Sequence, residues 1–348
     1  MKSVLLIARA EQEKMWRVDC CFKPIIEHMI DVCKQACMDH IYLLSDEGVD
    51  FDGVECIPAD EFTLDRLTRD GEIFVLRGNM PLLSCDIFNE NTGIFCFKND
   101  GSIDKETIFD HLIELEDEVN DYVSLACVEA KMRHLINQRH LSNGVHLIDP
   151  ATTYIGSDVR IDDGAVIYPN VVLKGTTQIG AGSVVTSGSY LENALIHENV
   201  VIESSKIIDS EVKDGVTIGP YSHLRGHSCV EAKVRIGNFV EFKNTHFGEG
   251  SKCAHLTYIG DSDVGKGVNI GCGVVTVNYD GKHKFRTTIK DGAFIGSNVN
   301  LIAPVTIGEK ALLAAGSTIT EDVEDGAMGI ARSRQSNKED FGKKYLTK

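Results

Sequence analysis

The chain has 348 residues, of which 43% are hydrophobic and 25% charged, so it is long enough for two globular domains. Its formal net charge of −17 argues against a nucleic-acid-binding protein, which normally carries a basic surface. No apolar run approaches the ~18 residues of a membrane span and the first residues do not have the form of a signal peptide, so we expect a cytoplasmic protein.

Residues 1–102 alternate between strand-like and helix-like segments, which predicts an α/β domain with a mostly parallel sheet. Strands are expected in SVLLIA, HIYLLSD, VECIPA and EIFVLRG, and helices in KPIIEHMIDVCKQA and near EFTLDRLTR. Residues 103–150 are polar with helical spacing, which predicts a helical connector arm.

From residue 151 to 330 an aliphatic side chain recurs every six positions in runs separated by slips, often followed by glycine, with residues 331–348 as a tail. A sustained six-residue repeat is typical of a left-handed parallel β-helix, in which three hexads make one triangular coil. The predicted inward residues are Ile155, Ile161, Ile167, Leu173, Ile179, Val185, Leu191, Val212, Ile218, Leu224, Val230, Ile236, Phe242, Cys253, Ile259, Val264, Ile270, Thr276, Ile289, Ile295, Leu301, Ile307, Leu313 and Ile319.

Residues eighteen apart in an unbroken run occupy the same place on consecutive coils, about 4.8 Å apart. Arg225 and Lys243 have this spacing and each follows an inward residue, so two cations are expected to stack on one outer edge. They repel each other unless an anion such as phosphate bridges them, although both could equally be solvated side chains. Ser297 and Ala315 have the same spacing, which fits either a shallow groove or ordinary corner residues.

The six-residue spacing breaks between Thr276 and Ile289, so VNYDGKHKFRTT is expected to leave the β-helix as a basic loop, a candidate anion contact. His255 is expected at an outward corner, and Tyr258 and Asn269 directly precede inward residues and therefore face outward. These three side chains indicate a site near the stacked cations, although a lone histidine is often only structural.

The segment from GPYSHLRGHSC to GIARSRQ contains the motifs GNFVEFKN, HLTYIGD, VNIG and VNYDG. On the basis of these motifs, residues 150–345 closely resemble the acetyltransferase half of a bacterial enzyme family. This family is the bifunctional N-acetylglucosamine-1-phosphate uridyltransferase/glucosamine-1-phosphate N-acetyltransferase. The resemblance implies an acyltransferase that takes part in the biosynthesis of UDP-N-acetylglucosamine for the cell wall. It also implies that the enzyme uses acetyl-CoA, needs no metal for acetyl transfer and is a homotrimer with sites between its subunits.

The resemblance also implies a role for each matching residue. His255 becomes the general base that takes a proton from the sugar amine, with Glu241 as a carboxylate near it. Imidazole exchanges protons near neutral pH, which suits this task. The phosphorylated amino sugar is held by Arg225, Lys243, Tyr258 and Asn269 with help from Lys284, and acetyl-CoA by Cys272, Asn278, Tyr279, Ser297, Ala315 and Arg332.

The uridyltransferase half of the family is matched only in part, by residues 1–102. The first strand runs into LLIARAEQEKMWRVD without the glycines that let backbone N–H groups close on a triphosphate. In LRGNMPLL, Asn79 stands where the family has the aspartate that binds Mg²⁺, and the long segment expected before NTG at Asn91 is absent. We expect that uridyltransferase activity is lost and that this domain is a shortened remnant.

Smaller departures lie in the acetyltransferase half. Gly226 and His227 follow Arg225 where the family has Pro-Gly, Cys272 replaces a smaller residue, and Phe341 stands where Trp is common. None of them removes a chemical role, but the substrate preference can have changed.

Three alternatives stay open from the sequence. They are the same chemistry on another phosphorylated or nucleotide-linked amino sugar, a noncatalytic hexapeptide-repeat scaffold, and a metal-dependent enzyme that uses His223, His227, His246 and His255. A scaffold needs none of the matched polar residues, and His223 and His227 are four apart on a coil rather than a helix, so both of the last two are disfavoured. No nucleic-acid or membrane partner is expected.

Overall fold

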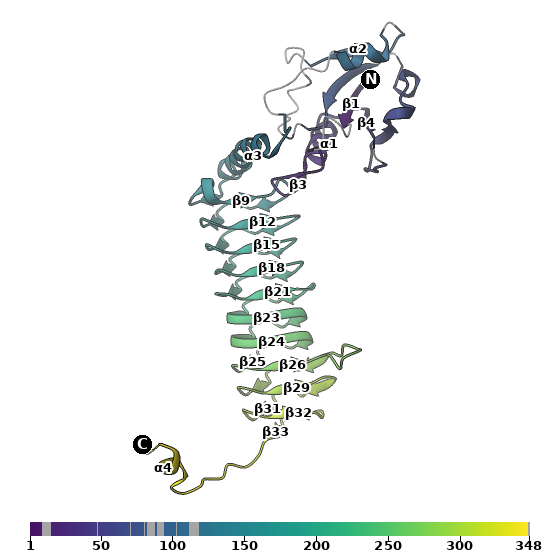
Figure 1. The fold of residues 1–348 in the computed structure, drawn as a ribbon. Helices are drawn as coiled ribbons and strands as arrows, with labels where there is room; N and C mark the ends of the chain where they lie inside the picture. The colour runs from purple at the N-terminus through teal and green to yellow at the C-terminus, as the bar shows by residue number, and fades with distance from the viewer. Residues whose placement is uncertain are drawn as a thin grey trace. The chain divides into compact units, whose positions relative to one another are not determined.

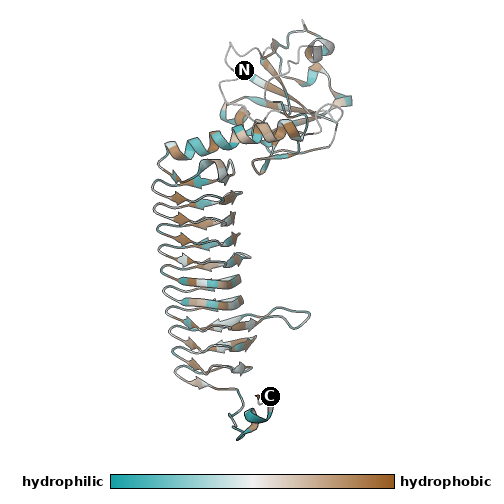
Figure 2. Ribbon diagram, turned by 60° about the vertical axis from the view of Figure 1, so that its left-hand side comes forward, coloured by the Kyte–Doolittle hydropathy of each residue, from teal (hydrophilic) through white to brown (hydrophobic). Residues whose placement is uncertain are grey.

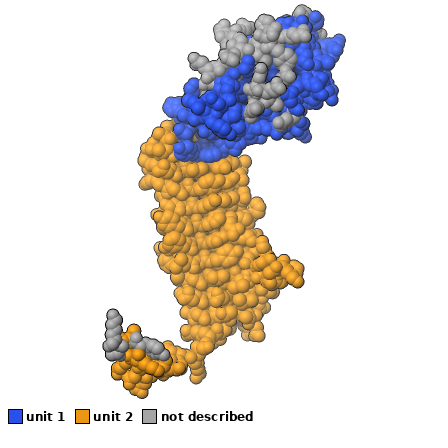
Figure 3. Space-filling view, viewed as in Figure 1, with its two compact units in different colours: residues 1–139, 154–157 blue, residues 140–153, 158–348 orange. Residues whose placement is uncertain are grey.

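The computed structural model describes residues 1–8, 15–46, 48–69, 71–79, 81, 88, 94–101, 103–110 and 118–346. The chain divides into two compact units (Figure 3). The first unit contains Met1–Arg139 and Tyr154–Ser157, and the second contains His140–Thr153 and Asp158–Lys348. Among the described helices, none is both long and apolar enough to cross a membrane.

The first unit is built on a mostly parallel sheet, as the sequence predicts. Its elements are β1 (Lys2–Ala8), β2 (Asp19–Cys20), β3 (Lys23–Pro24), α1 (Ile25–Gln35), β4 (His40–Ser45), β5 (Glu55–Pro58), β6 (Glu72–Arg77), β7 (Cys96–Lys98), α2 (Lys105–Asp110), α3 (Tyr122–Ser142) and β9 (Tyr154–Ile155). The five-stranded sheet has the order β5-β4-β1-β6-β7, and only the β6–β7 pair is antiparallel. Apolar side chains of β1, β4 and β6 alternate between two buried clusters, one shared with α1 and the other with α2.

The prediction of a helix near EFTLDRLTR is wrong. The segment forms two short 3-10 turns, η1 (Ala59–Glu61) and η2 (Leu64–Arg66). Phe62 and Thr63 between them are extended, with ψ angles of 120° and 151°. Phe62 is buried in the sheet cluster, and this packing outweighs the weak helical spacing of the segment.

The second unit is the predicted left-handed parallel β-helix, whose coils have three flat faces (Figure 1). Two long strands, β23 (Arg235–Phe247) and β24 (Lys252–Val264), run through all three faces. Face 1 also contains β8 (His146–Leu147), β11 (Val166–Ile167), β14 (Val184–Val185), β17 (Val201–Ile202), β20 (Thr217–Ile218), β25 (Asn269–Ile270), β28 (Phe294–Ile295), β31 (Leu312–Leu313) and β33 (Met328–Gly329). Face 2 contains β12 (Val172–Lys174), β15 (Tyr190–Glu192), β18 (Lys206–Ile208), β21 (His223–Arg225), β26 (Val275–Val277), β29 (Asn300–Ile302) and β32 (Thr318–Ile319). Face 3 contains β10 (Arg160–Ile161), β13 (Gln178–Ile179), β16 (Leu195–Ile196), β19 (Glu211–Val212), β22 (Cys229–Val230), β27 (Thr287–Ile289) and β30 (Val305–Ile307).

The remaining elements of this unit are the 3-10 turn η4 (Pro150–Thr152) and the C-terminal helix α4 (Phe341–Leu346). We call the turn between face 1 and face 2 the first corner, and the turn between face 2 and face 3 the second corner.

The core of the β-helix consists of the predicted inward residues, each at most 7% exposed. Hydrophobic and hydrophilic residues alternate along its strands (Figure 2). Ile196, Ile202, Ile207 and Phe247 are equally buried but were missed by the six-residue count. Ile196, Ile207 and Phe247 each follow the preceding inward residue by five positions, and Ile202 follows Ile196 by six. A five-residue step shortens a coil to seventeen or sixteen residues without ending the sheet, as the pairings of Lys243 with Gly260 and of Leu191 with Ile207 show.

Candidate active site

Several predicted site residues lie in a column at the first corner, one above another on successive coils. Strand pairing places Asn238 beside His255. The registers of β24 with β25, β25 with β28 and β28 with β31 then bring Cys272, Ser297 and Ala315 to the same position on successive coils. Backbone hydrogen bonds of 2.7 and 2.8 Å join the last three corners. The small exposed side chains of Ser297 and Ala315 therefore continue the line that starts at His255.

His255 is exposed, and its ring is oriented by Asn238, with 3.0 Å between Nδ1 of the imidazole and Oδ1 of the amide. An amide oxygen only accepts hydrogen bonds, so Nδ1 carries the proton and Nε2 keeps a free lone pair. Such a nitrogen can accept a proton from a substrate. Asn238 was missed from the sequence because it lies seventeen rather than eighteen residues before His255.

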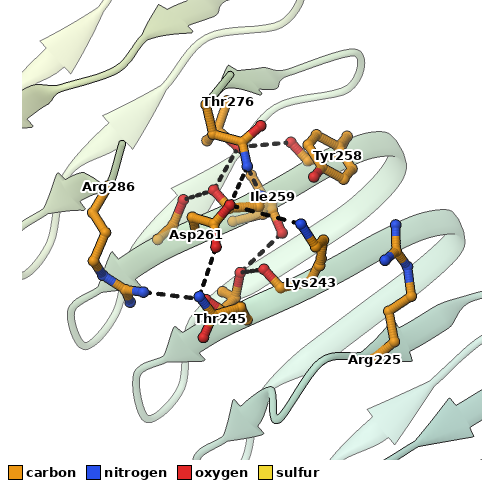
Figure 4. Close-up of polar contacts among 12 residues, drawn as sticks. Arg225, Lys243, Thr245, Tyr258, Ile259, Asp261, Thr276 and Arg286 are labelled. Atoms are coloured by element: carbon orange, nitrogen blue, oxygen red, sulfur yellow. Dashed lines mark hydrogen bonds and ion pairs between the residues drawn. The ribbon is translucent and has the colours of Figure 1, made fainter. Parts of the chain in front are cut away.

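Face 2 carries the predicted pair of stacked cations (Figure 4). Arg225 is in register with Lys243, but each also has a carboxylate beside it. The guanidinium of Arg225 donates to Oε1 of Glu241 from Nε at 2.8 Å and from Nη2 at 2.6 Å. The ammonium of Lys243 lies 3.9 Å from Oδ2 of Asp261. Solvated cations without partners are therefore excluded, and Glu241 is engaged by Arg225.

A third cation reaches this place from the projecting loop. The nearby ammonium of Lys284, followed by burial, lowers the pKa of Lys243, and Arg225 adds to this effect. Like charges disfavour one another's protonated form, which is the physical cause of this lowered pKa. The three cations Arg225, Lys243 and Lys284 against the carboxylates of Glu241 and Asp261 give this part of face 2 one net positive charge, which suits an anion such as a phosphate.

Tyr258 lies on the next coil of the same face. Its backbone is in register with Glu241, while its phenol folds along the strand over Gly260, where an added Cβ would overlap Oη. Gly260 is itself in register with Lys243. The hydroxyl of Tyr258 therefore lies in the column that begins with Arg225 and Lys243.

The base of the loop is held by a ladder of amides at the second corner. Asp261 is 5% exposed and accepts from Nδ2 of Asn244 at 2.6 Å and from Nδ2 of Asn278. The side chain of Asn278 is therefore already used inside the protein. At the other end of the loop, Arg286 donates to both oxygens of Asp263 at 2.6 and 2.9 Å. The loop projects from the side of the β-helix in Figures 1 and 2.

The other predicted residues lie on different sides of the coil. Asn269 is on face 1, and Tyr279 is exposed on the loop, where its hydroxyl donates to the carbonyl of Gly281 at 2.7 Å. Arg332 is exposed, and its Cδ lies 3.9 Å from where a Cβ at Gly316 would stand, beside the first corner. The predicted residues thus span face 1, both corners and face 2, and they do not line one pocket within a single chain.

The four histidines of the metal-dependent alternative are separated in the same way. His223 is on face 2, His227 at the second corner, His246 on face 3 and His255 at the first corner. One metal ion cannot bind all four of these side chains from a single chain, because they lie on different sides of the coil.

Asn79, which replaces the expected Mg²⁺-binding aspartate, is fully buried in the first unit. Its Nδ2 donates to the carbonyl of Val119 at 3.3 Å and to Oδ1 of Asn120 at 3.1 Å, and the backbone carbonyl of Asn79 accepts from the backbone N–H of Val119 at 3.0 Å. The amide therefore ties the end of β6 to the segment before α3. The other N-terminal features that depart from the family, at residues 9–14 and 91–93, lie outside the described residues.

The turn after Arg225 also departs from the family. Gly226 and His227 both have positive φ angles, 65° and 60°. A proline is restricted to negative φ, so this turn cannot have the family's Arg-Pro-Gly conformation. Arg225 is nevertheless held in place by Glu241.

Comparison with known proteins confirms the resemblance found in the sequence. A family model described as "Bacterial transferase hexapeptide (six repeats)" matches residues 286–321. The "Bifunctional protein GlmU" of Shouchella clausii (strain KSM-K16) is 46% identical over 289 residues, which are 73% of this chain and 62% of the relative. The proteins of the same name from Geobacillus sp. (strain WCH70) and Clostridioides difficile (strain 630) are 53% and 52% identical over 223 and 226 residues, 64% and 65% of this chain and 49% of each relative. The chain thus spans about half to three fifths of the length of these relatives.

Two solved structures are more distant. One is the UDP-N-acetylglucosamine acyltransferase of Francisella novicida, with a TM-score of 0.34 and 20% identity over 54% of this chain and 66% of that chain. The other is the acetyltransferase domain of PglB from Neisseria gonorrhoeae FA1090 in complex with acetyl coenzyme A, with a TM-score of 0.17 and 15% identity over 94% of this chain and 96% of that chain.

Proposed function

We propose that this protein is an acetyl-CoA-dependent N-acetyltransferase that converts glucosamine 1-phosphate to N-acetylglucosamine 1-phosphate. The observation that carries the proposal is the column at the first corner, in which an exposed His255 with a free Nε2 is followed by the small residues Cys272, Ser297 and Ala315. The net positive charge of face 2 supports a phosphorylated substrate. Similarity to the curated relatives supports the choice of amino sugar.

In the proposed reaction the neutral amine of the sugar attacks the thioester carbonyl of acetyl-CoA. A C–N bond forms, the C–S bond breaks, and CoA leaves as a thiolate. Nε2 of His255 takes the proton that the amine loses and passes it to solvent or to the leaving sulfur. Arg225, Lys243 and Lys284 hold the phosphate with the hydroxyl of Tyr258 beside them, and Arg332 meets a phosphate of CoA.

We propose further that the enzyme is a homotrimer with the site between subunits, because the required residues occupy different sides of one coil. An exposed apolar column supports this. Tyr221, Phe239 and Leu256 stack at the first corner next to His255 and are 62%, 53% and 60% exposed, with the two aromatic rings 5.6 Å apart. Large apolar patches on a free surface are unusual, and a second copy of the chain is the occupant that would complete the site.

The N-terminal unit, we propose, has lost uridyltransferase activity. Asn79 brings no negative charge for Mg²⁺, and its amide hydrogens are used within the protein. The sequence after β1 also lacks the glycines of a triphosphate-binding loop.

The decisive experiment follows release of the CoA thiol from acetyl-CoA with glucosamine 1-phosphate, in the presence of a chelator. Wild type should turn over, His255→Ala should lose about 10²- to 10⁴-fold in kcat, and His134→Ala, an exposed histidine of α3, should not change. Turnover only with another amino sugar would change the substrate, and no turnover with any of them would favour a scaffold. Light scattering should give a trimer, and Phe239→Asp should dissociate it.

A parallel assay measures pyrophosphate release from UTP and N-acetylglucosamine 1-phosphate with Mg²⁺. A rate above background in the wild type would overturn the proposed loss of the first activity.

A further inference from the structure

Face 3 carries a group of metal-binding side chains that the proposed acetyl transfer does not use. Cys229 on β22 is in register with His246 on β23, and Glu231 follows Cys229 by two positions, so all three point outward from one face. The thiol, a carboxylate oxygen and an imidazole nitrogen all lie within 4.8 Å of one another. Among the residues that the structure describes, no other group of three or more His, Cys, Asp or Glu side chains converges in this way.

The spacing of these atoms is close to that of a tetrahedral zinc site. Nε2 of His246 lies 3.1 Å from Oε1 of Glu231, and Sγ of Cys229 lies 3.8 Å from the same oxygen. Zn²⁺ has bonds of about 2.0 Å to N and O and about 2.3 Å to S, so a tetrahedral ion holds its ligand atoms roughly 3.3 to 3.6 Å apart. The distance from Sγ of Cys229 to the imidazole nitrogen is at most 4.8 Å, so the three groups must draw closer together to bind one ion.

The donor set selects the class of cation. A thiolate, an imidazole and a carboxylate suit Zn²⁺, whereas Mg²⁺ and Ca²⁺ prefer oxygen ligands alone. Glu211 adds negative charge, with its Oε2 4.0 Å from Sγ of Cys229. It is itself paired with His197 at 2.8 Å and with Lys213, so we regard it as a neighbour of the site rather than a ligand.

A cavity of about 700 Å³ opens beside the group and is lined by Glu231 and His246. Its other walls include Asp263, Lys266 and Lys290. Three protein ligands next to an open space are typical of zinc sites whose fourth position takes water or a further ligand. We propose that Cys229, Glu231 and His246 form a Zn²⁺ site on face 3 whose fourth coordination position faces this cavity.

The electrostatics fit a cation. The carboxylates of Glu231 and Glu211 lie 3.8 and 4.0 Å from Sγ of Cys229 and place negative charge around it. A bound Zn²⁺ replaces the thiol proton, and binding therefore releases protons to the buffer. The site escaped detection in the sequence because its Cys and His lie seventeen residues apart on neighbouring coils.

The test uses the full-length protein, stripped with EDTA and titrated with Co²⁺ as a spectroscopic probe. One Co²⁺ should bind per chain, with a thiolate-to-cobalt charge-transfer band in the near ultraviolet and the visible bands of a tetrahedral ion, and Zn²⁺ should displace it. Cys229→Ser should abolish the charge-transfer band. Glu231→Gln and His246→Gln should each weaken binding by at least about 10- to 100-fold. The matched control Cys96→Ser, an exposed thiol of the first unit, should leave the titration unchanged.

A second readout follows the thiol of Cys229 directly. Alkylation of Cys229, followed by mass spectrometry of its peptide, should slow in the presence of Zn²⁺ and recover with EDTA, while alkylation of Cys96 should not change. Absence of the charge-transfer band, or equal Zn²⁺ protection in wild type and Glu231→Gln, would overturn the proposal. Neither measurement depends on acetyl transfer, so the zinc site can fail while the proposed enzyme activity stands, and the reverse.

Discussion

The hydrogen bond between Asn238 and His255 gives the sharpest prediction about the reaction. Asn238→Ala removes the acceptor that keeps the proton on Nδ1 of His255, so the ring is free to turn and to change tautomer. A neutral hydrogen bond of this kind, 3.0 Å long between side chains that are not deeply buried, contributes about 1 kcal/mol net. At about 1.4 kcal/mol per tenfold, kcat should fall roughly fivefold, far less than the loss on removing the base itself.

Asn238→Asp provides the matched comparison. A carboxylate still accepts from Nδ1, so the ring keeps its orientation, but its charge stabilises the protonated imidazole. The acid limb of kcat against pH should therefore move to higher pH in Asn238→Asp and stay in place in Asn238→Ala. Thiol release from acetyl-CoA, measured from pH 5 to 9, records both effects.

The reasoning also requires that the two residues act together. In a His255→Ala background, Asn238→Ala should cause no further loss, because the bond is already absent. If the two losses multiply, or if Asn238→Asp leaves the pH profile unchanged, Asn238 does not position the base.

Three further predictions test other contacts. Gly260→Ala should displace the ring of Tyr258 and raise KM for the sugar phosphate about tenfold, which corresponds to the loss of one hydrogen bond. KM for acetyl-CoA should not change. The control is Gly48→Ala, because a Cβ at Gly48 would meet no neighbouring atom. Because the pKa of Lys243 is lowered, phosphate binding should weaken as pH rises through a value below the usual lysine range, and Lys243→Arg, which stays charged, should abolish this high-pH rise in KM. Asn79→Asp should not restore Mg²⁺-dependent pyrophosphate release. It should destabilise the first unit by about 3 kcal/mol in urea unfolding, because a carboxylate at this fully buried position would face the carbonyl oxygen of Val119 and Oδ1 of Asn120.

The β-helix could be predicted almost completely because one aliphatic position per six residues determines which side chains point inward. The prediction missed Ile196 and Phe247, since a five-residue step buries a side chain as well as a six-residue step does when the corner tightens. In the first unit the spacing of apolar residues was sufficient for α1 but misleading near Phe62, where burial against the sheet decides the conformation.

The site was less predictable than the fold. Arg225 and Lys243 were paired correctly because their coil has eighteen residues. Asn238 and Asp261 were not found, because their partners lie seventeen residues away and the eighteen-residue spacing applies only within runs that have no slip. Spacing in a single sequence therefore identifies residues stacked on neighbouring coils only where no five-residue step lies between them.

The thin core of the β-helix links the two proposed sites. On the coil that runs through β23, Val240 and Phe242 are buried next to the residues of the acetyl-transfer site, and Phe247 is buried beside His246, with the rings of Phe242 and Phe247 4.8 Å apart. A metal ion bound on face 3 is therefore separated from face 2 only by one layer of packed side chains, which has little freedom to adjust. Zn²⁺ should then stabilise these coils against unfolding without touching a substrate, and for this reason the chelator belongs in the acetyl-transfer assay as a separate variable.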